Sequence, residues 1–426
     1  MKSKRCSVIV IELILATVLI ALPCAAQEYH LHPPAEPIPA TMFGLVIHNA
    51  VTKTPWPDVP FSGWRLWDSG VTWWNLEPGK KGNLEFVNLD KMVSLAQNHG
   101  TKILMNLGMS PTWASARPYE SAKFRPGSTA EPKNIQDWRD FVNAVGTRYK
   151  GRIHDWEIWN ETNDKAFYTG SIGSLLELSK TAYQSLKEID SSNVVVAPSP
   201  TYGMQGTDWL ASYLRAGGSG FADVIGYHFY ADSPEAMVPL AQKVRTVMAE
   251  NGVGDKPLWN TEAGWYIQNK TGTVAKSGAF TPLPPLEAVG FVARSYILNW
   301  ATGVSRFYWY DWDSAVMSLA DDDGKTLKPA GYAYEVIQRW LVGARMTACN
   351  SDSSNTWICE ITRDNGYNGY IVWNPKGDRD FKVPSGWKAQ IQRELDDHHG
   401  DVSASAVKIG IRPILLENKA APWERH

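Results

Sequence analysis

Residues 154–164 have the sequence HDWEIWNETND, which begins as a hydrophobic strand and ends on an amide and a carboxylate, Asn160 and Glu161. A carboxylate at the mouth of an apolar strand is costly to remove from water. Either a partner satisfies it, or its perturbed pKa serves a chemical purpose. The stretch therefore predicts a buried strand with a candidate functional residue at its C-terminal end.

The same pattern recurs on both sides of this stretch, where short apolar runs alternate with amphipathic segments. Residues 49–63 are the weakest unit, because they contain prolines and no helical pattern. Eight alternations over about 300 residues predict a (β/α)8 barrel, the TIM barrel of the α/β class. The expected strands are TMFGLVIH (41–48), GWRLWD (63–68), KILMNL (102–107), HDWEIWN (154–160), VVVAP (194–198), DVIGYHF (223–229), PLWNTE (257–262) and RFYWYDW (306–312).

The character of the sequence changes near residue 343, where polar and β-prone residues alternate around turn signals. We expect a catalytic barrel over residues 27–342 and a small, β-sandwich-like accessory domain over residues 343–426. Cys349 and Cys359 are an even pair in what reads as an exported chain, which favours a disulfide over a metal site. This bond would staple the first hairpin of the β domain.

Residues 1–26 resemble an export signal, with a basic start, an apolar run and small residues before a cleavage point near Ala26. We expect the protein to be secreted or periplasmic. The alternative is an uncleaved segment that anchors the chain to the membrane, because about 18 apolar residues can span a bilayer. The formal net charge of −2 argues against nucleic-acid binding.

In such a barrel the chemistry lies at the C-terminal ends of the strands. Glu161 ends the fourth expected strand and Glu262 ends the seventh, so the two face each other across the barrel mouth. A pair of carboxyl groups suits glycosidic bond cleavage, in which one protonates the leaving oxygen and the other attacks or assists at the anomeric carbon.

Other strand ends supply candidate support and substrate-binding residues. Arg65 can hold a carboxylate ionised, or it can form a structural ion pair with Glu157. His228 and Tyr230 lie two apart on one face, although His228 could also be a satisfied core histidine. Trp309 or Trp312 could form a platform under a sugar ring.

The motifs GWRLWD, WEIWNE, YHFY and WNTEAGW, in this order over residues 41–342, resemble glycoside hydrolase family 39, most closely its bacterial branch that acts on exopolysaccharides. This resemblance implies that Glu161 is the acid/base, that Glu262 is the nucleophile and that Asn160 contacts the hydroxyl at carbon two. It implies no cofactor and no metal. Relatives often continue with proline after the glutamate, whereas Thr162 stands here.

The mechanism implied is a retaining double displacement. We expect apolar surroundings and a second carboxylate to raise the pKa of Glu161, and Arg65 and Tyr230 to keep Glu262 ionised. Trp113 and Trp265, among other aromatic residues after strand ends, favour endo action on a polysaccharide. The alternatives are an exo-acting β-xylosidase-like enzyme and a non-catalytic carbohydrate-binding barrel. A metal-dependent deacetylase would need clustered His and Asp ligands, which the strand ends lack.

Overall fold

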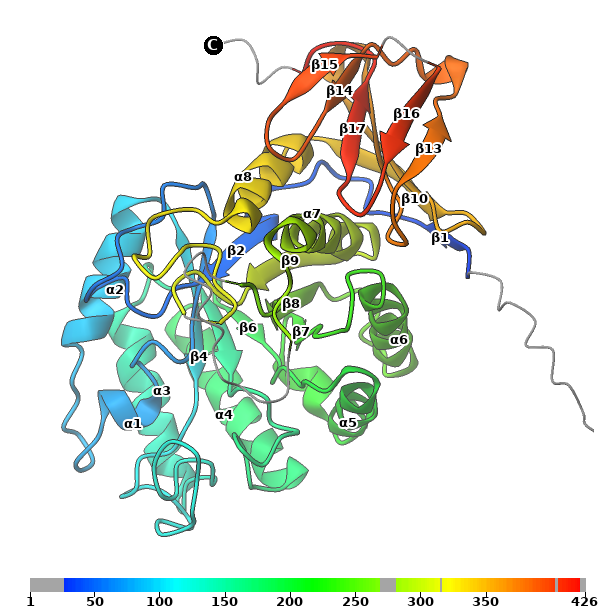
Figure 1. The fold of residues 1–426 in the computed structure, drawn as a ribbon. Coiled ribbons are helices and arrows are strands. Elements are labelled where there is room, and N and C mark those ends of the chain that lie inside the picture. Colours follow the sequence, from blue (N-terminus) through cyan, green and yellow to red (C-terminus); the bar gives the residue numbers. More distant parts are fainter. Residues whose placement is uncertain (1–26, 269–280, 315, 403–404, 422–426) are drawn as a thin grey trace, which may run out of the picture.

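The computed structural model describes residues 27–268, 281–314, 316–402 and 405–421, so the expected export signal lies outside the described residues. Eight parallel strands form one sheet in the order β6-β5-β4-β3-β2-β9-β8-β7 (Figure 1). They are β2 (Phe43–Val46), β3 (Gly63–Leu66), β4 (Lys102–Leu107), β5 (Asp155–Ile158), β6 (Val194–Val196), β7 (Ile225–Tyr227), β8 (Leu258–Ala263) and β9 (Val304–Trp309).

The sheet is nearly closed into the predicted barrel. An isolated parallel bridge joins Val196 of β6 to Val224 just before β7, and the Ala197 N–H donates to the Val224 carbonyl at 2.9 Å. Inside the barrel, Tyr308 packs with Leu104 and Trp259 in a separate hydrophobic cluster. The (β/α)8 prediction is therefore confirmed.

The helices surround the strands, and the connection from β2 to β3 contains no α-helix, as the prolines of that segment indicated. Every residue from Ala288 to Ala301 of α7 is buried, because the C-terminal domain covers the face of this helix that the barrel leaves open (Figure 1). The helices are α1 (Trp73–Leu76), α2 (Val87–Asn98), α3 (Ile135–Arg148), α4 (Ile172–Ile189), α5 (Gly203–Arg215), α6 (Met237–Glu250), α7 (Pro285–Ala301) and α8 (Pro329–Leu341).

The C-terminal domain is antiparallel and has two layers. Its larger sheet has the order β1-β10-β11-β12-β17-β14-β15, and β13 pairs with β16 in a second sheet. Val372, Ile409 and Leu416 form a small core that joins both sheets, as expected for a sandwich-like domain. The strands are β1 (Tyr29–Leu31), β10 (Arg345–Ser351), β11 (Trp357–Arg363), β12 (Tyr367–Trp373), β13 (Arg379–Lys382), β14 (Ile391–Arg393), β15 (His399–Asp401), β16 (Ala406–Ile409) and β17 (Ile414–Glu417).

The expected domain boundary needs one correction. Residues 29–31 were assigned to the barrel, but β1 is an edge strand of the C-terminal sheet and pairs antiparallel with β10 (Figure 1). A three-residue strand carries too little periodicity to be detected, and its partner lies more than 300 residues further along the chain. The C-terminal domain is therefore built from both ends of the chain.

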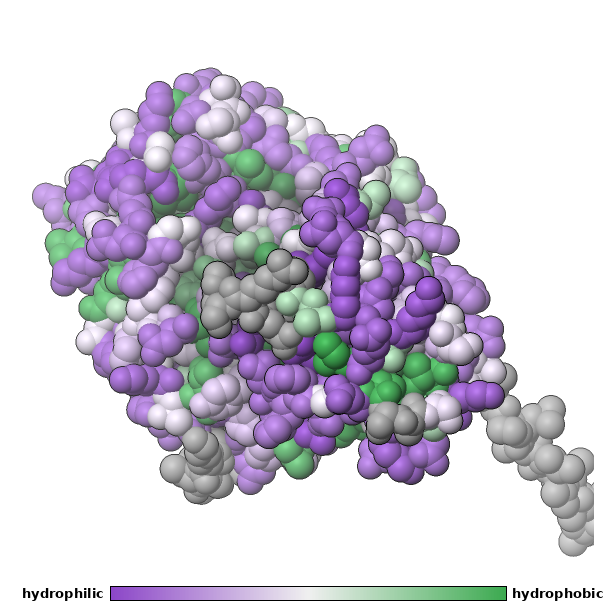
Figure 2. Space-filling model, turned by 90° about the horizontal axis from the view of Figure 1, so that it is seen from above, coloured by the Kyte–Doolittle hydropathy of each residue, from purple (hydrophilic) through white to green (hydrophobic). Residues whose placement is uncertain are grey.

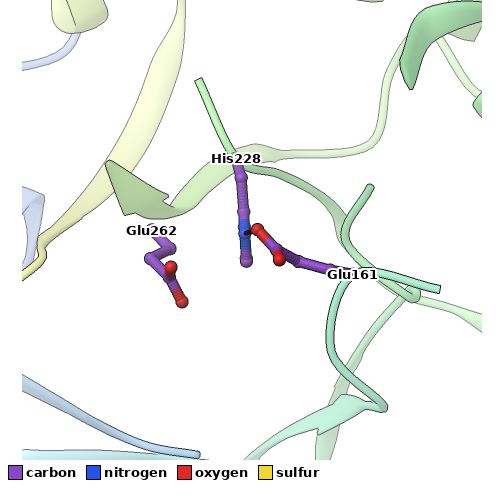
Figure 3. A group of neighbouring side chains, drawn as sticks. All are labelled: Glu161, His228 and Glu262. Atoms are coloured by element: carbon purple, nitrogen blue, oxygen red, sulfur yellow. Dashed lines mark hydrogen bonds and ion pairs between the residues drawn. The ribbon is translucent and has the colours of Figure 1, made fainter. Parts of the chain in front are cut away.

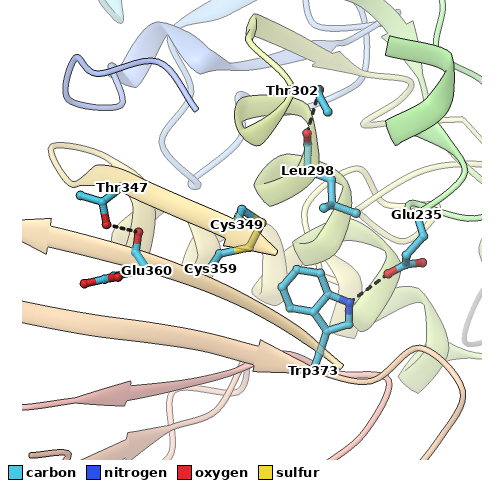
Figure 4. The surroundings of a disulfide bond; sticks show 8 residues. All are labelled: Glu235, Leu298, Thr302, Thr347, Cys349, Cys359, Glu360 and Trp373. Atoms are coloured by element: carbon cyan, nitrogen blue, oxygen red, sulfur yellow. Dashed lines mark hydrogen bonds between the residues drawn. A yellow bond between two sulfur atoms is a disulfide. The ribbon is translucent and has the colours of Figure 1, made fainter. Parts of the chain in front are cut away.

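Cys349 and Cys359 form the expected disulfide (Figure 4). The two cysteines are direct cross-strand partners of β10 and β11, and both are fully buried. The bond therefore staples the first hairpin of the domain, as the sequence predicted.

The two domains are tied together by charged groups at their interface. Glu235, just before α6, accepts from Arg294 of α7 at 2.8 Å. It also accepts from the Trp373 indole of β12 at 2.9 Å (Figure 4). Arg363 of β11 donates to the Val342 carbonyl at 2.8 Å, next to the C-terminus of α8. The Arg294 side chain is only 2% exposed, so the ion pair between Arg294 and Glu235 is buried on the Arg294 side.

Figure 2 shows one face, which is largely hydrophilic, with hydrophobic residues scattered in small patches. Within the described parts of the chain, no helix has both the length and the apolar character needed to cross a membrane.

Candidate active site

A cavity of about 840 Å³ lies at the C-terminal ends of the barrel strands. Five of the predicted site residues line it: Asn160, Glu161, Tyr230, Glu262 and Trp265. Asp68, Lys123, Phe124, Tyr202 and Tyr310, which the sequence analysis did not select, line it as well.

Arg65 of β3 organises the floor beneath this cavity. Its Nε donates to Glu157 Oε2, its Nη1 to Glu262 Oε2 and its Nη2 to Asn160 Oδ1, each at 2.7 Å. Arg65 is fully buried and does not line the cavity, so it positions these groups and does not bind substrate directly, which corrects its expected role. The sequence offered two interpretations of Arg65, an ion pair with Glu157 and a bond to a carboxylate at the barrel mouth. Arg65 makes both contacts, the second with Glu262.

Glu157 is a buried anion with a complete set of donors. Besides Arg65, Ser199 Oγ donates to it at 2.6 Å and Asn106 Nδ2 at 3.0 Å. Burial works to raise the pKa of Glu157, but the charges of Arg65 and His228 outweigh burial, and the pKa lies below its ordinary value. Glu157 therefore anchors Arg65 from below the cavity.

Glu262 ends β8 and accepts from two donors. Arg65 binds its Oε2, and the Tyr230 hydroxyl donates to its Oε1 at 2.8 Å. Burial nevertheless raises its pKa above the ordinary value, although the charges of His228 and Arg65 oppose the rise. The sequence indicated the two donors, Arg65 and Tyr230, but not the burial of the Glu262 carboxyl group. The two donors still favour the carboxylate, since each of its oxygens accepts one bond.

Glu161 is held by His228 on the opposite side (Figure 3). His228 Nδ1 lies 2.8 Å from Glu161 Oε1, and the two side chains point toward each other. His228 Nε2 lies 3.5 Å from Arg65 Nη2. His228 is fully buried and is absent from the cavity lining, so it orients Glu161 and does not bind substrate, which corrects its expected role.

The backbone around Glu161 is strained. Trp159 has φ 59° and Glu161 has φ 44°, the left-handed region that residues other than glycine rarely adopt. Asn106 Nδ2 donates to the Trp159 carbonyl at 2.7 Å, and the Glu161 N–H donates to the Ser199 carbonyl at 3.1 Å. Such outliers persist where the surroundings enforce them, and they cluster at active sites.

The aromatic residue that β9 presents to the cavity is Tyr310, and the predicted platforms Trp309 and Trp312 are wrong. Both indoles are buried, with exposures of 0% and 1%, and donate to the carbonyls of Met317 and Gly324. Side chains alternate along a strand, and Tyr308 lies in the barrel interior, so Trp309 faces the helices. The sequence pattern indicated the correct strand, but the side chains of Trp309 and Trp312 lie on the wrong face of it.

Of the two predicted substrate-binding residues Trp113 and Trp265, only Trp265 lines the cavity. Trp265 lines the cavity, with its indole N–H donating to the Ala231 carbonyl at 2.8 Å. Trp113 is absent from the lining; it packs edge-on against Trp73 at 6.0 Å and donates to the Glu77 carbonyl at 2.8 Å. Trp113 therefore supports the loops around the barrel and does not contact substrate in the cavity.

Glu161, His228 and Glu262 also resemble a metal-binding set, because one ligand atom of each lies within 4.8 Å of the others (Figure 3). The surroundings disfavour a cation, however. The Arg65 guanidinium already contacts Glu262, and Tyr230 occupies the second oxygen of the same carboxylate. A second positive charge would be placed against a fixed one.

Comparison with known proteins agrees with this geometry. Residues 58–267, which include Arg65, Glu161 and Glu262, match the model of glycosyl hydrolases family 39. A family 39 glycoside hydrolase from Bacteroides cellulosilyticus WH2 superposes with a TM-score of 0.68 at 20% identity, covering 89% of this chain and 81% of that one. A monomeric β-xylosidase from Caulobacter crescentus CB15 gives 0.62 at 17% identity, covering 90% and 97%.

A GH30 xylanase C catalytic domain from Talaromyces cellulolyticus has the same fold, with a TM-score of 0.59 at 14% identity over 91% of this chain and 98% of that one. At such identities the solved structures establish the fold, and the family model carries the assignment. The match extends over the strands that deliver both carboxyl groups. The chain thus carries a glycoside hydrolase family 39 domain and is a glycosidase.

Proposed function

We propose that this protein is a retaining β-glycosidase in which Glu262 is the nucleophile and Glu161 the acid/base. The observation that carries the proposal is the closeness of the two carboxyl groups, which offer oxygens within 4.8 Å of each other. Retaining enzymes hold the pair about 5–5.5 Å apart, whereas inverting enzymes leave about 6.5–9.5 Å for a water molecule.

In the first step, Glu262 attacks the anomeric carbon while the glycosidic C–O bond breaks, and the leaving oxygen takes a proton from Glu161. In the second step, Glu161 accepts a proton from water, whose oxygen displaces Glu262 from the same carbon. The donors assigned above suit these roles. Arg65 and Tyr230 balance the charge of the nucleophile, and His228 leaves Glu161 Oε2 available to the leaving group.

Substitution of each glutamate tests the roles. Glu262→Ala should lose activity on every substrate, because no covalent intermediate forms. Glu161→Ala should fail on natural glycosides but still react with activated aryl glycosides, and added azide should rescue its turnover as a β-glycosyl azide. As a control, Glu77→Gln changes another buried glutamate, one that bonds to the Trp73 indole outside the cavity, and should remain active.

A fluorosugar inactivator should label the peptide that contains Glu262. Label on Glu161 would reverse the two roles, and a product of inverted configuration would overturn the retaining mechanism.

We also propose endo action on a polysaccharide or exopolysaccharide. Support comes from aromatic residues on several loops around the cavity, Phe124, Phe167 and Tyr202 in one group and Trp265 and Tyr266 in another, which offer stacking surfaces for more than one sugar. The competing activity is exo cleavage, as the name of the Caulobacter β-xylosidase suggests. A polysaccharide digest that yields a ladder of oligosaccharides supports endo action, and release of monosaccharide alone refutes it.

Export is a further part of the proposal. The signal-like pattern of residues 1–26 supports it, and so does the disulfide, because disulfides persist in oxidising compartments. Sequencing the N-terminus of protein recovered outside the cytoplasm should find a start near residue 27. Recovery of the intact leader in the membrane fraction would favour an uncleaved anchor instead.

A further inference from the structure

A second group of polar side chains lies next to the nucleophile, at the ends of three neighbouring strands. His48 follows β2, Asp68 follows β3 and Tyr310 follows β9. Asp68 Oδ2 accepts from His48 Nε2 at 2.9 Å and from the Tyr310 hydroxyl at 2.7 Å. Asp68 and Tyr310 both line the cavity, so this pair belongs to its wall.

His48 fixes Asp68 because it is itself fixed. Asp313 Oδ1 lies 3.1 Å from His48 Nδ1 and also accepts from the His48 backbone N–H at 2.8 Å. Burial works to lower the pKa of His48, but Asp313 and Asp68 outweigh it and raise the pKa to about 11. His48 is thus an imidazolium whose two ring nitrogens donate to two carboxylates, and Asp68 is held as an anion.

Asp68 has acceptor capacity that the protein does not use. Its Oδ1 is a buried atom that accepts no hydrogen bond from any residue in the described part of the chain, although Oδ2 accepts two. The side chain keeps 18% of its surface exposed. An ionised carboxylate accepts up to about four hydrogen bonds, and buried acceptors are normally satisfied. Sugar hydroxyls are donors of the kind this carboxylate lacks.

The position of Asp68 restricts which hydroxyl it can meet. In the proposed mechanism Glu262 must reach the anomeric carbon, and the resemblance to glycoside hydrolase family 39 implies that Asn160, just after β5, contacts the hydroxyl at carbon two. Asp68 and Tyr310 come from the arc β3-β2-β9, which lies between β5 and β8 around the barrel. Once carbons one and two are assigned, the ring hydroxyls that remain are those at carbons three and four.

We propose that Asp68 is a specificity-determining residue, whose carboxylate, held by His48 and Tyr310, accepts a hydrogen bond from the hydroxyl at carbon three or four of the sugar next to Glu262. This inference rests on the proposed function. It assigns to Asp68 the choice of the sugar whose bond is cleaved.

The test compares wild-type enzyme and Asp68→Asn on four parent probes, the 2,4-dinitrophenyl β-D-xylopyranoside, glucopyranoside, mannopyranoside and galactopyranoside. The best parent is then compared with its 3-deoxy and 4-deoxy forms. For wild type, one deoxy form should lower kcat/KM about 10- to 100-fold, as expected for a lost bond to a charged group. Asp68→Asn should treat that form and its parent alike, within about threefold, as the coupling of a double-mutant cycle requires.

Glu77→Gln is the control, because it removes the charge of a buried carboxylate that bonds to the Trp73 indole outside the cavity. It should keep the discrimination between parent and deoxy probes. The role of Asp68 is overturned if wild-type enzyme cleaves a parent probe and both of its deoxy forms with equal kcat/KM. This result does not depend on whether Asp68→Asn folds. Discrimination that survives Asp68→Asn also overturns it. Wild type that cleaves no parent probe contradicts the proposed function itself.

Discussion

Glu157→Gln tests whether the buried anion beneath the cavity sets the state of the nucleophile. The substitution keeps the shape of the side chain and removes its charge. Glu157 accepts from Arg65 at 2.7 Å, from Ser199 at 2.6 Å and from Asn106 at 3.0 Å. A bond to a charged group contributes about 1.5–3 kcal/mol and a neutral one about 1 kcal/mol, so three weakened bonds predict a loss of about 2–5 kcal/mol in the free energy of unfolding.

The effect on catalysis has a definite sign. Without Glu157 the charge of Arg65 acts on Glu262 with less competition, so the pKa of Glu262 should fall. Glu262 must be ionised to attack, and the acidic limb of kcat/KM reports its ionisation. The limb should therefore move to lower pH, by roughly half a unit to one unit.

Asp155→Asn is the matched control. Asp155 lies two residues earlier on β5 and forms an ion pair with Arg306 at the other end of the barrel. Urea unfolding should show a comparable loss of stability for both variants, while a pH profile on an aryl glycoside should shift for Glu157→Gln alone. An acidic limb that stays in place or moves to higher pH in Glu157→Gln would refute the reasoning.

Three further predictions concern stability. Replacing Cys349 and Cys359 with serine should cost the β domain about 2–3 kcal/mol while the barrel still folds, because a disulfide restricts mainly the unfolded loop; calorimetry showing loss of the whole fold would contradict this. Glu235→Ala should cost about 3–5 kcal/mol, because it leaves the buried Arg294 without its carboxylate, and should split the thermal transition in two; a single unshifted transition would show that the contact is dispensable. Burial raises the pKa of Asp311 from 3.8 to about 6, so the stability that this group contributes is present below pH 3.8 and is lost as the pH rises through 6. In urea unfolding at pH 7, Asp311→Asn should therefore be more stable than wild type by up to about 3 kcal/mol. Equal stability of the two proteins at pH 7 would count against the burial argument.

The barrel and the placement of Glu161 and Glu262 at its mouth were predictable because each depends on a local pattern. Apolar runs separated by helical segments mark the strands, and Glu161 and Glu262 each stand where such a run ends. Arg65 was identifiable for the same reason. That it binds both Glu157 and Glu262 depends on three strands meeting in space, which no local pattern records.

The errors came from features that depend on side-chain direction or on distant partners. Trp309 and Tyr310 are neighbours in sequence, and the choice of which one faces the sugar depends on the phase of the strand. His228 has the right residue type and strand, but only the packing around it shows that it is sealed beneath Glu161. Asp68 was visible in GWRLWD, yet its partners His48 and Tyr310 lie on two other strands.

The pairing of β1 with β10 can form only late in the synthesis of the protein. Tyr29 binds Ser351, 322 residues further along the chain. At about 5–20 residues per second, a ribosome needs roughly 15–60 s to deliver that partner after Tyr29 has been made. Throughout this interval the first strand has no sheet to join. β1 and β10 can therefore meet only after nearly all of the barrel sequence has been synthesised, so closure of the C-terminal sheet is a late event that follows translation of the barrel strands.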